Sequence, residues 1–73
     1  MDENKEPKSL SAGELARQAG VSTDTLRHYE AKGVIQRPPR RANGYRSYPA
    51  ETIERVRLIR RALTIGFSLD ELT

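Results

Sequence analysis

The 73-residue chain contains no cysteine and only one histidine. Without cysteine it can form no disulfide framework, no thiolate metal site and no thiol nucleophile. No apolar run approaches the roughly 20 residues of a membrane-spanning helix, and the charged N-terminus lacks the apolar segment of a secretory signal. The carboxylates are spread over expected helix starts and exposed faces, so no nucleophile–base pair and no metal cluster is expected. We therefore expect a cytoplasmic protein that is not an enzyme, with no catalytic residues, no cofactor, no bound metal and no membrane partner.

Basic residues are concentrated in the middle of the chain. The formal net charge is only +3. Between Ala31 and Ala50, however, there are five basic residues and no acidic one. Such an uneven distribution of charge predicts a polyanion as the partner.

Residues 9–73 are expected to form one small domain after a disordered tail at 1–8, which is charged and shows no periodicity. The first helix is expected at 12–19, because Ser11 and Glu14 have the spacing of a capping box. Gly20 is expected to end it in a left-handed conformation. Ser22 then caps a second helix at 22–32. Two helices joined by a short glycine turn predict a helix-turn-helix, although a purely structural helical hairpin has the same pattern.

The second helix is expected to have one buried and one polar face. Leu26 and the ring of Tyr29, or the stem of Lys32, share one face at helical spacing. The outward positions carry groups that form hydrogen bonds, and they are Thr23, Thr25, Arg27 and His28. A polar helix that follows a glycine turn suits reading of the DNA major groove.

Residues 34–48 are expected to form a two-stranded β-hairpin, or wing. Residues 33–36 are predicted to be one strand, Asn43-Gly44 favours a hairpin turn, and residues 45–48 alternate aromatic and polar side chains as a returning strand does. The charged residues of the loop are all arginine. Arginine-only charge favours contact with phosphate; a solvated loop is the alternative.

A third helix is expected over about 50–65, with Pro49 at its start. Its apolar face contains Ile53, Val56, Ile59 and Leu63, widened by Leu58, Ala62 and Ile65. We expect an ion pair between Glu51 and Arg55 within this helix. Its arginines are expected to be solvated or paired rather than to bind DNA.

The last residues carry a second helix-start signal. Phe67 is expected to pack back on the core, and Ser68 and Glu71 have the spacing of a capping box that opens a fourth helix at 69. Because one turn of helix is unstable alone, we expect the chain to be the front module of a longer protein. Glu30 is expected to be a surface charge.

Several short motifs follow one another in a distinctive order. They are Glu14-Leu15-Ala16, Gly20-Val21-Ser22, Leu26-Arg27-His28-Tyr29-Glu30, Gly33-Val34-Ile35, Asn43-Gly44-Tyr45-Arg46-Ser47-Tyr48 and Gly66-Phe67-Ser68-Leu69. Over roughly residues 9–73 this order resembles the N-terminal winged-helix DNA-binding domain of MerR-type transcriptional regulators. The resemblance implies a mainly α, winged helix-turn-helix fold.

The resemblance also implies which residues bind DNA. Arg27 is expected at a phosphate or a base edge, and Tyr29 beside the backbone or a thymine methyl. His28 stands where the family usually has tyrosine or phenylalanine. Two alternatives for it therefore stay open: a base contact, or a partly buried ring packed against the wing. Pro49 replaces the usual serine or threonine cap. The expected DNA-binding residues are Ser11, Arg17, Thr23, Asp24, Thr25, Arg27, His28, Tyr29, Arg37, Arg40, Arg41, Asn43, Gly44, Tyr45 and Arg46.

Family members dimerise through a long helix after this domain and bind their signal in a variable C-terminal region. The resemblance therefore implies a homodimer in a full-length protein, a palindromic promoter operator in the nucleoid, and RNA polymerase as an indirect partner. The 73-residue chain alone is expected to be monomeric.

Two other functions have different tests. An architectural, excisionase-like protein that bends DNA would share the wing and the helix-turn-helix but lack a sensor domain. A protein-interaction module would keep its partner after charge reversal at Arg27 and Arg46.

Overall fold

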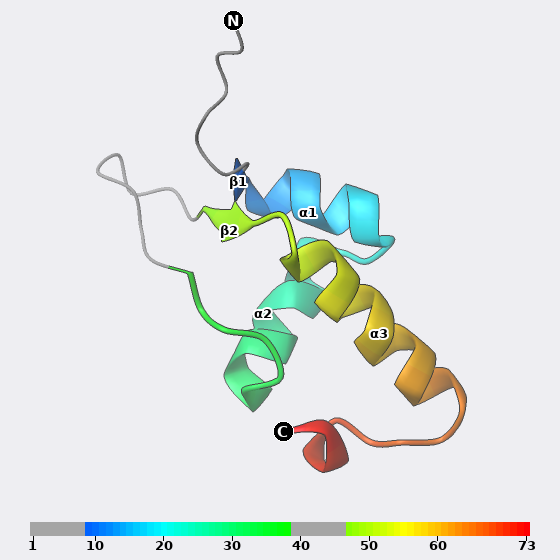
Figure 1. Ribbon diagram of the computed structural model, residues 1–73. Helices are drawn as coiled ribbons and strands as arrows, with labels where there is room; N and C mark the ends of the chain where they lie inside the picture. Colours follow the sequence, from blue (N-terminus) through cyan, green and yellow to red (C-terminus); the bar gives the residue numbers. More distant parts are fainter. Residues whose placement is uncertain (1–8, 39–46) are drawn as a thin grey trace, which may run out of the picture.

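The computed structural model describes residues 9–38 and 47–73, and three helices dominate it (Figure 1). In chain order the elements are β1 (Ser9–Leu10), α1 (Ala12–Ala19), α2 (Thr23–Lys32), β2 (Tyr48–Pro49), α3 (Thr52–Thr64) and the short 3-10 helix η1 (Asp70–Leu72). The expected fold class, mainly helical with a small two-stranded antiparallel sheet, is confirmed.

Local hydrogen bonds explain where α1 and α2 begin and end. Ser11 Oγ accepts a hydrogen bond from the Glu14 N–H at 3.1 Å, and Ser22 Oγ accepts one from the Thr25 N–H at 3.0 Å. Gly20 and Gly33 follow the two helices with φ of 79° and 81°, a region that L side chains rarely adopt. The helix-turn-helix is thus specified by side chains within three residues of each helix end.

The sheet pairs different segments from those expected. β1 and β2 are antiparallel, with Ser9 opposite Pro49 and Leu10 opposite Tyr48. The expectation that residues 33–36 would form the partner strand is wrong for the described part of the chain, where Val34 and Ile35 lie outside any strand. Their backbone closes α2 instead, because the Val34 N–H donates to Tyr29 O at 3.0 Å and both side chains are buried in the core.

The third helix begins later than expected, at Thr52. Pro49 belongs to β2 and does not start the helix. Ala50 and Glu51 form the turn between them, in which the Ile53 N–H donates to Ala50 O at 3.0 Å. Proline is compatible with this place because the two-residue strand ends there and needs no further N–H donor.

The core lies where the three helices and β2 meet. α1 packs against both α2 and α3. The buried apolar residues are Leu15, Ala16, Ala19, Leu26, Tyr29, Val34, Ile35, Tyr48, Val56 and Ile59. β1 and η1 add the partly buried Leu10 and Leu72, which pack against this core, so every element contributes to one small core.

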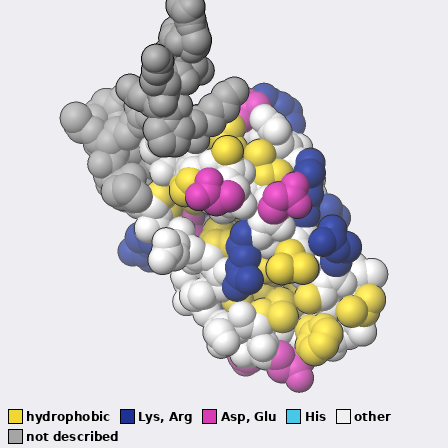
Figure 2. Space-filling view, viewed as in Figure 1, with side chains coloured by type: hydrophobic (Ala, Val, Ile, Leu, Met, Phe, Trp, Pro, Cys, Tyr) yellow, Lys and Arg dark blue, Asp and Glu magenta, His cyan; other side chains and the backbone are white. Residues whose placement is uncertain are grey.

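Among residues 9–38 and 47–73, three large apolar side chains remain outside this core. Leu58 is 49% exposed, Ile65 75% and Phe67 49%. Figure 2 shows hydrophobic side chains gathered at the lower right, over the end of α3. The expectation that Phe67 packs back on the core is wrong. The expectation that Leu58 and Ile65 widen the buried apolar face of α3 is wrong too. A spacing of seven residues places these two on the same side of α3, and the core does not reach that side.

The second capping box forms as expected. The Ser68 N–H donates to Glu71 Oε1 at 2.8 Å, and the Glu71 N–H donates to Ser68 Oγ at 3.3 Å. The element it opens is the three-residue 3-10 helix η1. Lys32 Nζ lies 3.1 Å from Asp70 Oδ1, so an exposed ion pair joins the end of α2 to η1.

Candidate nucleic-acid interface

The outer face of α2 carries the polar residues that the sequence predicted there. Thr23, Asp24, Arg27 and His28 are exposed. Thr25 is half-buried, and its Oγ1 lies 2.9 Å from Ser22 Oγ in the helix cap. His28 is exposed, so the alternative of a partly buried ring is not supported. The face presents hydroxyl, carboxylate, guanidinium and imidazole groups side by side.

Arg27 and Asp24 form an ion pair on this face, with Arg27 Nη1 3.0 Å from Asp24 Oδ1. Both side chains are mostly exposed, so the pair contributes little to stability. Because the pair is weak, the Arg27 guanidinium can exchange the Asp24 carboxylate for another acceptor at small cost. While the pair is formed, it holds the guanidinium near the first turn of the helix.

Tyr29 does not lie on the outer face. Its side chain is in the core, with only 4% exposed. The expected contact of Tyr29 with a thymine methyl or the DNA backbone is therefore not supported by the structure, and the residue anchors α2 from beneath. Its spacing of three from Leu26 places both residues on the buried face.

Glu30 is buried, whereas the sequence analysis expected a surface charge. It is 8% exposed, and the Tyr48 hydroxyl donates a hydrogen bond to Glu30 Oε2. A buried carboxylate needs such donors to offset its lost hydration. The i,i+4 spacing between Leu26 and Glu30 was the signal in the sequence, since it places Glu30 on the buried face of α2.

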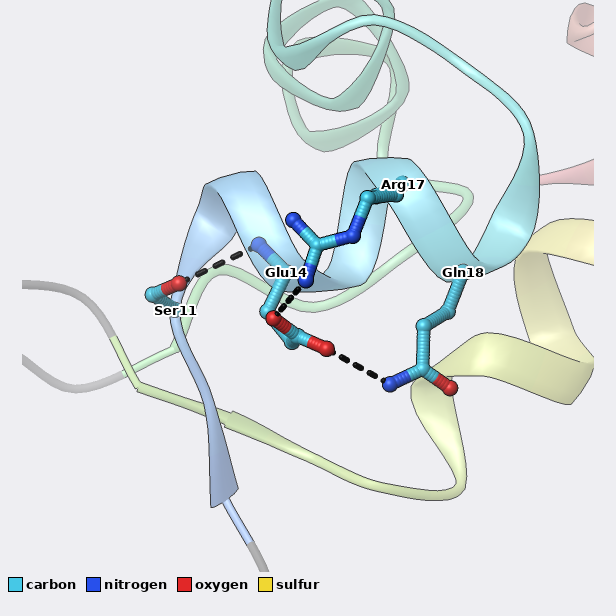
Figure 3. A network of polar contacts seen from close by, with 4 residues as sticks. All are labelled: Ser11, Glu14, Arg17 and Gln18. Atoms are coloured by element: carbon cyan, nitrogen blue, oxygen red, sulfur yellow. Dashed lines mark hydrogen bonds and ion pairs between the residues drawn. The ribbon is translucent and has the colours of Figure 1, made fainter.

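The first helix brings Ser11 and Arg17 into one polar network, drawn in Figure 3. The Glu14 carboxylate accepts hydrogen bonds from Arg17 and from Gln18, the latter at 2.8 Å. These donors, Gln18 first and Arg17 second, lower the pKa of Glu14 below its ordinary value. The capping box therefore forms in part: Ser11 caps the helix as expected, while Glu14 points along the helix to Arg17 and Gln18.

The described residues contain the two ends of the expected wing, 34–38 and 47–48. Arg37 is exposed. The other expected wing contacts lie outside the described residues, and they are Arg40, Arg41, Asn43, Gly44, Tyr45 and Arg46. The expected tail at 1–8 also lies outside them.

Arginines of α3 bond to the ends of the other two helices. Arg55 Nε donates to Val34 O at 2.9 Å, so the expected Glu51–Arg55 pair gives way to a carbonyl that follows α2. Arg57 Nη2 donates to Gln18 O at 3.0 Å, and its Nη1 lies 3.3 Å from a carboxylate oxygen of Glu54. Sequence spacing could not reveal the two carbonyl contacts, because they join distant segments.

In residues 9–38 and 47–73, no group of three or more histidine, aspartate or glutamate side chains could hold a metal ion. In the same residues, no helix has the length and apolarity required to cross a membrane.

Known proteins are similar to this chain in sequence and in fold. The family described as MerR HTH family regulatory protein matches residues 10–73. A mercuric resistance operon regulatory protein of Bacillus cereus is 43% identical over 60 residues, which are 82% of this chain and 46% of that protein. The HTH-type transcriptional regulator CueR of Yersinia pestis is 40% identical over 62 residues, 85% of this chain and 45% of that protein. The chain thus spans about half the length of these curated relatives.

A solved structure gives the same fold. It is HiNmlR, a MerR family regulator lacking the sensor domain and bound to promoter DNA, with a TM-score of 0.78 and 23% identity over 89% of this chain and 52% of that one. From the family match over residues 10–73, the chain belongs to the MerR HTH family of regulatory proteins.

Proposed function

We propose that this chain is the operator-reading module of a transcriptional regulator and binds double-stranded DNA in a sequence-specific manner. The observation that carries the proposal is the exposed polar face of α2, anchored from below by Leu26 and Tyr29 and presented after a tight glycine turn. The names of the relatives, which are regulators of transcription, support it.

In this proposal α2 enters the major groove, which is wide enough for one helix. Arg27 leaves Asp24 and donates to a guanine edge or a phosphate, since a guanidinium fork matches both acceptors. Thr23, Asp24 and His28 face the neighbouring bases and backbone. Different donors and acceptors on one face are what distinguishes one base pair from another in this groove.

The backbone contacts come from cations at the edges of this face. Arg37 and the other wing arginines bind phosphates and release counterions, so affinity falls as salt rises. In a full-length protein two copies bind a palindromic promoter operator in the nucleoid, and RNA polymerase is affected indirectly. The 73-residue chain binds a half-site weakly, as a monomer.

The test is selection of duplexes from a random pool by the 73-residue chain at two salt concentrations. Enrichment of a short half-site is the expected result, and Arg27→Ala should lose preference at one or two positions of that half-site. Binding without enrichment would instead favour an architectural protein that recognises DNA shape. Failure to bind at low salt would refute the proposal and direct the search to protein partners.

A further inference from the structure

Arg57 and Arg60 of α3 contact the end of α1, and Arg60 also lies beside the glycine of the turn that leads into α2. We infer that these two arginines, called here the arginine pair, are positioning residues that fix the first turn of α2 relative to the rest of the domain. The inference about structure stands alone, and its consequence for DNA reading rests on the proposed function.

The arginine pair satisfies carbonyls at the end of α1. Arg57 Nη2 donates to Gln18 O at 3.0 Å, and Arg60 Nη1 donates to Ala19 O at 3.4 Å. The last carbonyls of a helix have no N–H partner within the helix and carry the negative end of its dipole. Two cations placed there complete the hydrogen bonds of these carbonyls and interact favourably with the negative end of the dipole.

Arg60 also occupies the space beside the turn glycine. A Cβ on Gly20 would lie 3.0 Å from Arg60 Nη1. The chain then needs only Val21 to reach Ser22, the cap of α2. A movement of the turn is therefore passed directly to the first residues of α2.

None of the first three residues of α2 has a buried side chain. The buried residues of α2 are Leu26, Tyr29 and Glu30, so the first anchor in the core comes at the fourth residue of the helix. Thr23 and Asp24, which the proposed function places at the DNA, are held through the Ser22 cap and the preceding turn. The contacts that hold this turn thus decide where those two side chains point.

The same arginines could instead bind phosphate. Arg17, Arg57, Arg60 and Arg61 line a shallow hollow beside Gly20, where α1 and α3 lie side by side. The contacts of Arg57 argue for positioning, since its guanidinium already reaches both Gln18 O and Glu54. The guanidinium of Arg61 shows no hydrogen bond to any residue that the structure describes, so Arg61→Ala removes the same charge from the same helix and is the matched control.

The first experiment needs no DNA. Amide hydrogen exchange of the 73-residue chain would be followed at Gly20 and Val21, whose N–H groups donate to Ala16 O at 2.9 and 3.0 Å. In the Arg57→Ala/Arg60→Ala variant we expect exchange at these two amides to accelerate about ten-fold relative to the amides of α3, and in Arg61→Ala no such change. Uniform acceleration across all helices, or none, would overturn the inference, since a general loss of stability affects every amide alike.

Two glycine variants isolate the Arg60 contact. Gly20 and Gly33 have nearly the same φ, but a Cβ on Gly33 meets nothing within 4 Å. Both alanine variants therefore bear the backbone strain, and only Gly20→Ala displaces Arg60. Because the strain in Gly20→Ala also lies next to Val21, the contact is read from the effect of Arg60→Ala in each background. We expect Arg60→Ala to accelerate the exchange of the Val21 amide less in Gly20→Ala, where Arg60 is already displaced, than in Gly33→Ala. Equal acceleration in the two backgrounds would count against the inference.

The second experiment measures the ratio of dissociation constants for random duplex and for the selected half-site. Loss of folded protein weakens binding to both duplexes alike, so the ratio reports the geometry of the exposed polar face of α2. We expect the double variant to lose about ten-fold in this ratio and Arg61→Ala to keep it. An unchanged ratio with a salt slope lower by about one per arginine would identify phosphate contacts and refute positioning. If the parent selects no half-site, the proposed function fails, while the exchange experiment still decides the inference.

Discussion

The hydrogen bond between Tyr48 and Glu30 gives the sharpest test of how this small core is built. Tyr48 in β2 is 1% exposed, and its hydroxyl donates to the buried carboxylate of Glu30 in α2. The Tyr48→Phe variant removes one oxygen and leaves the ring in place. It therefore changes polar satisfaction with almost no change in packing.

The size of the effect follows from the burial of both partners. A hydrogen bond to a charged group contributes about 1.5–3 kcal/mol. A chain of this length has a total stability of only about 4–11 kcal/mol. A loss of about 2 kcal/mol should lower the thermal midpoint by roughly 8–16 °C.

Urea unfolding followed by circular dichroism would measure this loss. The matched control is Tyr29→Phe, because Tyr29 is also buried but shows no hydrogen bond from its hydroxyl to any described residue. We expect the midpoint to fall in Tyr48→Phe at unchanged m-value and to stay within about 0.5 kcal/mol of the parent in Tyr29→Phe. Equal stabilities of the two variants would refute the reasoning that Glu30 depends on this donor.

Three further predictions concern the core, the reading face and the first helix. Ile59→Ala should lower the free energy of unfolding by about 2–5 kcal/mol, since Ile59 is fully buried; urea unfolding against Leu58→Ala, at a half-exposed site, checks it. Arg27→Ala should weaken half-site binding by about 1–3 kcal/mol and relax the preference at the contacted base, which fluorescence anisotropy with single-base variants of the half-site measures. Glu14 should contribute stability above its ordinary pKa of 4.5 and lose it as pH falls through the lowered pKa of the folded chain. Thermal midpoints between about pH 3 and 6 should therefore fall less steeply in Glu14→Gln than in the parent, and identical slopes would contradict this.

The sequence alone was sufficient to predict the helix-turn-helix. The hydrogen bonds of Ser11 and Ser22 reach three residues along the chain, and the left-handed turns at Gly20 and Gly33 depend on a single residue each. Such signals are local, so they can be read without knowing what lies nearby in space. The polar outer face of α2 follows from the same helical periodicity.

Tertiary structure decided what joins these local units. β1 pairs with β2 although most of the chain's first half separates them, whereas a hairpin within residues 33–48 was the local expectation. Tyr48 reaches Glu30 across 18 residues, and Arg57 reaches Gln18 O across 39. No sequence spacing encodes these contacts, because each depends on how α3 and β2 pack against α1 and α2. A carboxylate or guanidinium at a helical position could equally have faced water, and only the packing of distant segments gave each its partner.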